Sequence, residues 1–168
     1  MPQTAITSPL AVGVEGDIAD QWTSAAGAID TVLQSEATAS IQFGVGVKRG
    51  TADDTILLLT ANTDALDGIT VYEADHPAPY ELGTVGILPG VTMRVLRFGR
   101  IKVIPEDNVD PTKGVFVRAI ANGGNTKIGA FRGTADGTNT IDVSAFAKWR
   151  TTTTGGNLGV LEINLIGA

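Results

Sequence analysis

The sequence predicts an all-β fold: a single-domain antiparallel sandwich or barrel of jelly-roll-like character, preceded by a short N-terminal arm. Three observations lead to this prediction. Glycine accounts for 21 of the 168 residues and charged residues for only 18%, whereas helical bundles favour Ala, Glu, Lys and Leu. Short apolar segments rich in β-branched residues follow one another along the chain, which favours strands. Turn signals such as Asp67-Gly68 and Asp136-Gly137 separate these segments at intervals of roughly 8 to 14 residues, as in β-sandwiches and barrels.

The chain divides into an arm and one domain. Residues 1–10 are uncharged, contain Pro2 and Pro9 and show no strand or helix pattern, so we expect an arm there. Residues 11–168 form the expected β-rich domain. Within residues 17–40, apolar residues recur near helical spacing, but 29–33 also read as a strand, so we expect a loop or short helix followed by a strand. Eight further segments are expected to be strands: 41–48, 55–60, 69–73, 91–104, 114–120, 128–132, 140–143 and 158–165.

The longest expected strand, residues 91–104, breaks strict alternation unless it contains one extra residue. We expect a bulge at Gly99, because a glycine inside a strand pattern often marks one. Such a bulge would bury four residues on one face: Leu96, Phe98, Ile101 and Val103. Three cations would then share the outer face: Arg97, Arg100 and Lys102.

Charge is distributed unevenly along the chain. Residues 1–93 carry a net charge of −10 and residues 94–168 carry +4, giving −6 in total. Two interpretations remain open. The two halves could form opposed acidic and basic faces, which would favour self-association, or the fold could interleave them so that the asymmetry disappears in space.

The sequence offers no signature of an enzyme, a cofactor site or a metal site. The chain has no cysteine, which excludes disulfides, thiolate nucleophiles and thiolate metal ligands. Its single histidine, His76, precedes Pro77 in a segment that resembles a surface loop. There is no Gly-x-Ser-x-Gly nucleophile motif and no Asp-x-Asp-x-Asp-Gly calcium loop. We therefore expect no catalytic residues and no bound cofactor or metal.

Nucleic acid and membranes are not expected partners. A net charge of −6 disfavours general phosphate binding, which needs clustered Lys and Arg. No apolar run approaches the roughly 18 to 20 residues of a membrane span, and residues 1–6 carry no basic signal-peptide region. We expect a soluble protein made in a cytoplasm.

Three stretches of the chain carry a specific resemblance. They are residues 13–20, residues 43–54, and the series 99–103, 113–118 and 129–132, closed by Trp149 and the segment 158–163. In this order and spacing they resemble the capsid cement, or decoration, proteins of tailed bacteriophages, over about residues 10–165. No single motif is diagnostic, because each consists of glycine and β-branched residues. The order and spacing carry the specificity.

The resemblance implies a non-enzymatic structural protein of the virion. Such a protein is made in the host bacterial cytoplasm, binds the outer surface of the mature capsid in many copies and bridges subunits of the major capsid protein. The shell is thereby stabilised against internal DNA pressure. The resemblance also implies dimers or trimers, with no cofactor and no direct contact with nucleic acid or membrane. Another virion part, such as a tail or baseplate β-domain, is the alternative, followed by a carbohydrate-binding module and, last, a small hydrolase.

Candidate contacts with the capsid or a sibling subunit fall into three groups. The arm is apolar enough to be buried yet too short to fold alone, and an interface role for the two tryptophans competes with a role in the core. The arginines could meet acidic surfaces. The candidates are Gln3, Thr4 and Ile6 of the arm, Trp22 and Trp149, and Arg94, Arg97 and Arg100.

Overall fold

The computed structural model describes residues 13–19, 29–73 and 86–166. These residues contain ten strands and one short 3-10 helix, as the all-β prediction requires. None of their helices is long and apolar enough to cross a bilayer. The elements are β1 (Ile29–Ser35), β2 (Gly46–Arg49), β3 (Thr55–Leu58), β4 (Gly68–Thr70), β5 (Thr92–Val103), β6 (Phe116–Arg118), β7 (Phe131–Arg132), η1 (Gly137–Asn139), β8 (Thr140–Asp142), β9 (Ala147–Trp149) and β10 (Gly159–Asn164).

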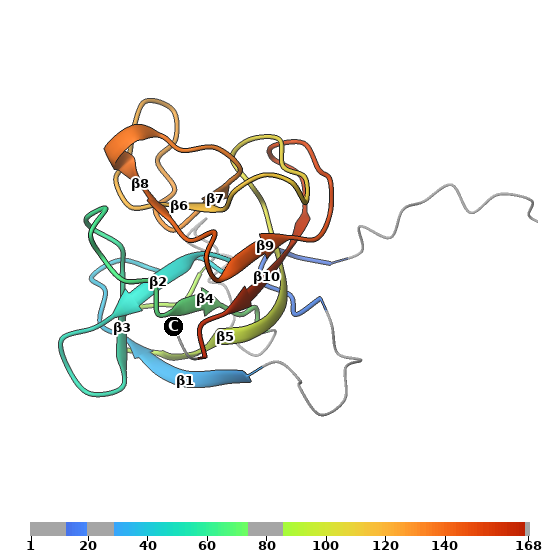
Figure 1. The fold of residues 1–168 in the computed structure, drawn as a ribbon. Coiled ribbons are helices and arrows are strands. Elements are labelled where there is room, and N and C mark those ends of the chain that lie inside the picture. Colours follow the sequence, from blue (N-terminus) through green and yellow to red (C-terminus); the bar gives the residue numbers. More distant parts are fainter. Residues whose placement is uncertain (1–12, 20–28, 74–85, 167–168) are drawn as a thin grey trace, which may run out of the picture.

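Five strands close into a barrel, so the barrel alternative of the prediction is the observed one. The strand order is β1-β3-β2-β4-β5, and β5 also pairs with β1, which closes the ring. The β1–β3 pair is parallel, with Gln34 opposite Thr55, and the other pairs of the ring are antiparallel. Closure pairs each of these five strands on both sides over at least part of its length. In Figure 1 the barrel occupies the lower part of the molecule.

The twelve-residue strand β5 belongs to two parts of the fold. Its first half pairs with β1 and β4, and its second half pairs with β10, which in turn pairs with β9. The register of β5 against β1 shifts between Phe98 and Leu96, so the extra residue is Arg97. The bulge that the broken alternation predicted is present, but its position at Gly99 was wrong. The pairing of β5 with β10 runs through Gly99 without a shift.

The shift changes the core to which β5 contributes. Leu96 joins Ile101 and Val103 in one hydrophobic cluster, as predicted, whereas Met93 and Val95 belong to the other. Phe98 is half-buried rather than fully buried, which corrects the prediction for this residue. The physical reason is that the bulge comes before Phe98, so Phe98 shares the face of Arg100 and Lys102.

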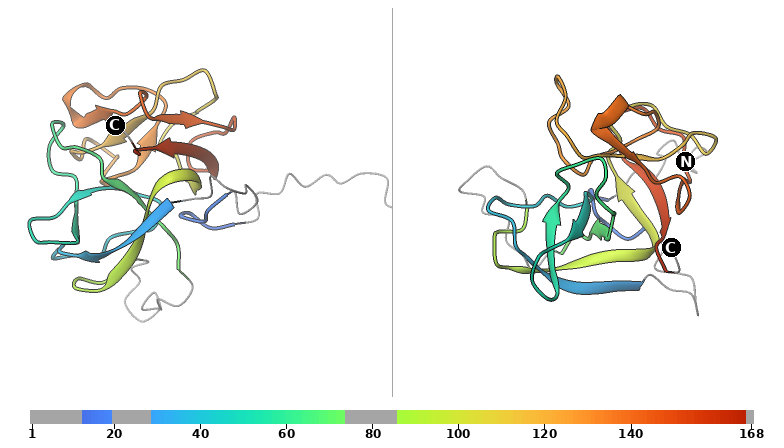
Figure 2. Two further views of the ribbon diagram at one scale, coloured as in Figure 1. Left: turned by 60° about the horizontal axis from the view of Figure 1, so that its bottom comes forward. Right: turned by 60° about the vertical axis from the view of Figure 1, so that its left-hand side comes forward.

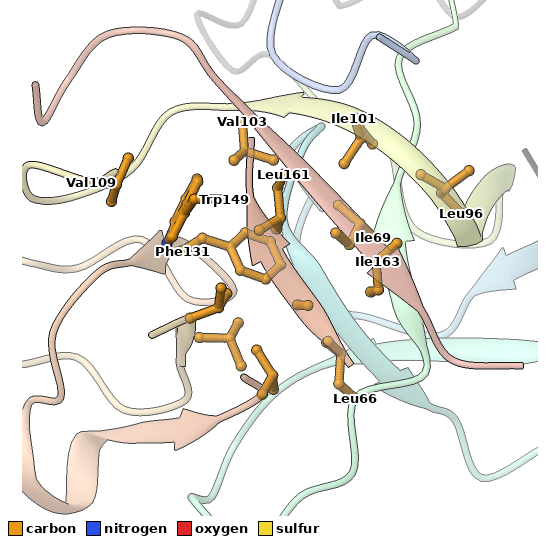
Figure 3. Close-up of a cluster of buried hydrophobic side chains, with 14 of the residues drawn as sticks. Leu66, Ile69, Leu96, Ile101, Val103, Val109, Phe131, Trp149, Leu161 and Ile163 are labelled. Atoms are coloured by element: carbon orange, nitrogen blue, oxygen red, sulfur yellow. The ribbon is translucent and has the colours of Figure 1, made fainter. Parts of the chain in front are cut away.

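A second, three-stranded sheet of order β7-β6-β8 covers one side of the barrel. The larger hydrophobic cluster joins residues of β4, β5, β6, β7, β9 and β10. Figure 3 shows its central members, which include Trp149, Phe131 and Leu161. The smaller cluster includes Leu33, Val47, Ile56 and Val95 of the barrel strands. The strand β5 supplies residues to both clusters and therefore ties them together.

The expected strands are present, mostly in shorter form. The strand expected at the end of residues 17–40 is β1, while the loop or helix before it lies largely outside the described residues. The segment 41–48 forms a strand only from Gly46, although Ile41 makes an isolated bridge to Ile87. The sequence reading missed β9, a three-residue strand. Three residues are too few for alternation to be visible.

Candidate functional site

The sheet formed by β5, β10 and β9 has one apolar face and one charged face. Successive residues of β10 alternate between buried and more exposed positions, with Leu161 and Ile163 in the large core. Between them Glu162 points to the other side, where it lies opposite Arg100 of β5 and Lys148 of β9. Because side chains alternate along every strand, the outer face gathers Arg100 and Lys102 of β5, Lys148 of β9, Arg150 just after β9, and Glu162 of β10. We call these five residues the cationic face.

Glu162 is the central anion of the cationic face. Arg150 donates to it from Nε at 2.9 Å and from Nη2 at 2.5 Å, and Arg100 donates from Nε at 2.7 Å. Hydrogen bonds from Arg150, followed by those from Arg100, lower the pKa of Glu162 to about 2. The carboxylate is therefore charged at every pH at which the protein is expected to work, and it orders the two guanidinium groups.

Ion pairs bind several cations of this face. Lys102 lies 3.7 Å from Asp17, and Lys148 is exposed with no acidic side chain within ion-pair distance among the described residues. Among the described residues, the side chains near Glu162 and Asp17 include Arg100, Lys102, Lys148 and Arg150. Sequence reasoning identified Arg100 and Lys102 but missed Lys148 and Arg150, because β9 gave no strand pattern. The side-by-side pairing of β9 with β10 is what brings these two cations to Glu162.

The three candidate arginines do not form one stripe. Arg97, at the bulge, forms an ion pair with Asp67 at 2.5 Å and is partly buried. Arg94 lines an open cleft of about 400 Å³ together with Asp17, Tyr72 and Lys102. Arg100 alone of the three belongs to the cationic face. The bulge at Arg97 and the ion pair with a distant loop residue explain the separation.

Trp149 is a core residue. Its side chain is 1% exposed and belongs to the large hydrophobic cluster (Figure 3). Its indole Nε1 donates a hydrogen bond to the backbone oxygen of Gly114 at 3.0 Å, which satisfies the ring's polar atom. The described surface therefore does not include this side chain. The candidates Gln3, Thr4, Ile6 and Trp22, together with His76, lie outside the described residues.

The fold interleaves the acidic and basic halves of the chain. Carboxylates of the first half form ion pairs with cations of the second: Glu15 with Lys127 at 2.6 Å, Asp17 with Lys102 at 3.7 Å and Asp67 with Arg97 at 2.5 Å. Much of the asymmetry along the sequence is thus neutralised in space. Glu15 also accepts a hydrogen bond from the backbone of Ile104 and fixes residues 13–19 beside β5.

No described group of side chains has the composition of a metal centre. Within residues 13–19, 29–73 and 86–166, no three His, Cys, Asp or Glu residues are grouped so as to hold a metal ion. The most buried charged group is the guanidinium of Arg118, which is bound by carboxylates in a structural network. The described residues form a packed β-protein that contains ion pairs and exposes the cationic face.

Comparison with known families decides the class of protein. Residues 1–165 match the family model described as structural cement protein (E217 gp24/Pam3 gp6). The chain belongs to the phage structural cement protein family. It is accordingly a structural protein of the phage virion that decorates the capsid and associates with its shell proteins. The family resemblance noted in the sequence is confirmed.

A solved structure shares the fold of this cement protein. A chain in the capsid of Myoviridae phage XM1 is similar, with a TM-score of 0.65, 17% sequence identity and coverage of 96% of both chains. A weaker likeness, with a TM-score of 0.47 and 14% identity, links 83% of this chain to 96% of the N base of the bacteriophage phi29 head fibre gp8.5. A search of curated proteins found no match.

Proposed function

We propose that this cement protein binds the outer surface of the mature capsid, where it contacts the major capsid protein and bridges neighbouring subunits. The observation that carries the proposal is the family match over residues 1–165. The proposed role is structural and non-enzymatic, with no direct contact with nucleic acid or membrane. The protein is made in the host bacterial cytoplasm and joins the shell as a homotrimer or homodimer.

Selective binding to the expanded lattice would stabilise the shell by mass action. A ligand that binds only one state of an assembly stabilises that state by RT ln(1 + [L]/Kd) per site. Packaged DNA pushes the subunits apart, so a ligand that spans two of them opposes their separation. An oligomer that contacts several subunits also gains avidity, because each later contact forms within the same complex. Modest individual contacts can therefore give a long-lived decoration.

The described structure supports this role through its internal cohesion. The strand β5 joins two hydrophobic clusters, and ion pairs link segments as far apart as Glu15 and Lys127. Regions with many buried apolar contacts open less readily than regions with few, which suits a unit that holds two contacts together. Residues 1–10, the proposed arm, would add a further contact with the shell or with a neighbouring copy.

Co-sedimentation with shells of the same phage tests the proposal. Purified protein is mixed with expanded capsids and, separately, with unexpanded procapsids, and the pelleted protein is quantified. Saturable pelleting with expanded capsids alone is the expected result, and its stoichiometry identifies the symmetry axes that are occupied. Absence of pelleting with either shell would contradict the proposal and favour a tail or baseplate component.

Deletion of residues 2–9 tests the arm in the same assay. We expect weaker binding to expanded capsids and an unchanged free energy of unfolding, because these residues precede the described fold. A variant with the eight residues replaced by a Gly-Ser sequence of equal length is the matched control, since it keeps the length but not the apolar side chains. Unchanged capsid affinity in both variants would show that the arm does not contribute to capsid binding.

A further inference from the structure

The strand β1 is paired along its whole length on one side only. On that side it pairs with β5, from Ile29 to Gln34. On the other side β3 meets only its C-terminal end, where the first matched pair is Gln34 with Thr55. Figure 1 shows β1 along the bottom of the barrel below β5, and the right-hand view of Figure 2 shows the same arrangement. Within the described residues, positions 29–33 therefore have a free edge.

The backbone N–H of Val32 points out of this free edge. Successive residues of a strand direct their backbone groups to opposite sides. The nitrogen of Ser35 donates to the oxygen of Val91, beside β5, at 2.9 Å, whereas the nitrogen of Gln34 donates to Asp54, on the β3 side, at 2.9 Å. Val32 lies two residues before Gln34 and shares its direction. No described residue accepts the N–H of Val32 on that side.

The free edge lacks the features that usually protect an unpaired strand. Val32 is 64% exposed, the highest value among the described large hydrophobic side chains. The β1 sequence Ile-Asp-Thr-Val-Leu-Gln-Ser contains neither lysine nor proline, two residues that commonly block pairing at an edge. The extra residue of the bulge is Arg97 of β5, so β1 itself stays regular. Such an edge favours the addition of another strand.

Residues 3–8 of the arm match the free edge in length and composition. They read Gln-Thr-Ala-Ile-Thr-Ser, with no charge and three β-branched residues, which favours an extended strand. Pro2 and Pro9 flank them, and because proline cannot donate to a ladder, an added strand is confined to the residues between them. Six residues of the arm can therefore cover the five residues 29–33 of the free edge.

The course of the chain favours the arm of another copy. Residues 16–19 bond to β5 first at Lys102 and then at Arg100, and β1 begins opposite Phe98. The chain thus approaches β1 along β5, and residue 13, to which the arm is joined, lies at the end of this path farther from β1. An arm that reached the β1 of its own chain would have to fold back along the path. The arm of a second copy needs no such reversal.

We propose that residues 3–8 of one copy add as a strand to the free edge of β1 in a neighbouring copy. Backbone hydrogen bonds at Val32 stabilise the contact. Thr4 and Ile6 share one face of the added strand and pack beside the exposed Val32 side chain. Exchange of an identical segment between copies is a low-cost route to an oligomer. The inference rests on the proposed function in that the arm takes part in assembly, and it names the surface that the arm meets.

Cross-linking between two single-cysteine variants tests the contact. The chain has no cysteine, so Ile6→Cys and Gln34→Cys each carry one thiol, the second beside the free edge. The two variants, one of them with a mass tag, are mixed and treated with a short bis-maleimide reagent, both free at high concentration and bound to expanded capsids. We expect a cross-linked pair with one chain of each kind. Thr138→Cys, at an exposed residue of η1, replaces Gln34→Cys in the control and should give no such pair.

Val32→Pro tests the backbone hydrogen bond itself. Proline removes an N–H that no described residue accepts, so the urea midpoint of this variant should stay close to that of the wild type. When it is combined with Gln34→Cys, the yield of the mixed pair should fall about tenfold, because one ladder hydrogen bond is lost and its acceptor is left unpaired. Val32→Thr keeps the N–H and the β-branched shape and is the matched control, which should leave the yield unchanged.

The outcomes separate this inference from the proposed capsid binding. Protein that pellets with capsids but forms no mixed pair in either sample overturns the strand addition alone. Mixed pairs in free protein that does not pellet support the strand addition and contradict the capsid binding. A folded Val32→Pro variant with an undiminished yield also overturns the inference, as does an Ile6→Cys/Gln34→Cys variant that cross-links only within one chain. If Val32→Pro does not fold, the mixed pair and its Thr138→Cys control decide.

Discussion

The guanidinium of Arg118 lies wholly inside the protein and meets the carboxylate of Glu106 at two points. Nε donates to Oε1 at 2.5 Å and Nη2 donates to Oε2 at 2.8 Å, with the Arg118 side chain 0% exposed. Nη2 also donates to Asp136 at 2.9 Å, and Arg132 adds a second cation to the same group. This network joins β6 and β7 to the loop that follows β5. It joins parts of the fold through ion pairs, as the large hydrophobic cluster does through apolar contacts.

Replacement of Arg118 by Ala should destabilise the fold strongly. The change leaves Glu106 and Asp136 with one fewer cation in a poorly solvated site, and removal of one partner from a buried ion pair costs about 3–5 kcal/mol. Urea unfolding measures this loss. Arg150→Ala is the matched control, because its ion pair with Glu162 is partly exposed and such pairs contribute about 1 kcal/mol or less. Equal losses in the two variants would contradict the structural role given to Arg118.

Acid should weaken the fold through Glu162. Hydrogen bonds from Arg150 and Arg100 lower its pKa from 4.5 to about 2. A lowered pKa stabilises the folded state above the unfolded value, so this contribution is complete above pH 4.5 and is lost as the pH falls towards 2. Burial raises the pKa of Asp64, but hydrogen bonds from Thr60 and Lys48 outweigh it and bring that value also to about 2.

The urea midpoint, measured across this pH range, tests the role of Glu162. The wild-type midpoint should fall as the pH is lowered, and Glu162→Gln should show a shallower fall because its side chain does not titrate. The remaining slope belongs to the other carboxylates, Asp64 among them. Superimposable pH profiles for the two proteins would show that Glu162 does not stabilise the fold in the manner described.

Gly129 should tolerate no side chain. It has φ of +83°, and a Cβ atom there would lie 2.5 Å from the backbone oxygen of Gly46. This close approach includes a hydrogen bond from the nitrogen of Gly46 to the oxygen of Gly129 at 2.8 Å, which fastens the barrel to the loop before β7. Gly129→Ala should cost about 1–3 kcal/mol or more of unfolding free energy. Gly124→Ala, at a site with nothing within 4 Å, should change stability by only about 0.5 kcal/mol.

Trp149 should affect stability and not capsid affinity. Trp149→Phe removes the hydrogen bond to Gly114 and part of the ring that fills the large cluster, at a cost of about 1–3 kcal/mol. The folded variant should nevertheless pellet with expanded capsids as the wild type does. A folded variant with wild-type stability and weakened capsid binding would contradict this prediction and indicate that Trp149 contacts the capsid.

Local pattern was sufficient to predict most of the strand positions and part of the β5 core. The alternation of residues 158–165 and the apolar residues Leu96, Ile101 and Val103 follow from the pleat of a strand, which depends on neighbouring residues only. The bulge could be inferred from the broken alternation of the same strand. Its location could not, because the pairing of β5 with β1 selects Arg97 as the extra residue.

Partners distant in sequence account for the remaining differences. Barrel closure between β1 and β5, and the parallel pair of β1 with β3, depend on topology that strand patterns do not contain. For the same reason the pairing of Arg97 with Asp67, 30 residues away, was not predictable from a row of arginines. Lys148 and Arg150 were missed because they become neighbours of Glu162 only through the β9–β10 pair.

The stability of DNA-filled heads tests the central claim of cementing most directly. Heads assembled without this protein are heated with and without saturating amounts of it, and the temperature of DNA release is measured by dye fluorescence. Saturation is verified by co-sedimentation of the same samples. The account predicts a higher release temperature once the expanded lattice is fully occupied. An unchanged release temperature at full occupancy would contradict it, because the protein would then decorate the shell without stabilising it.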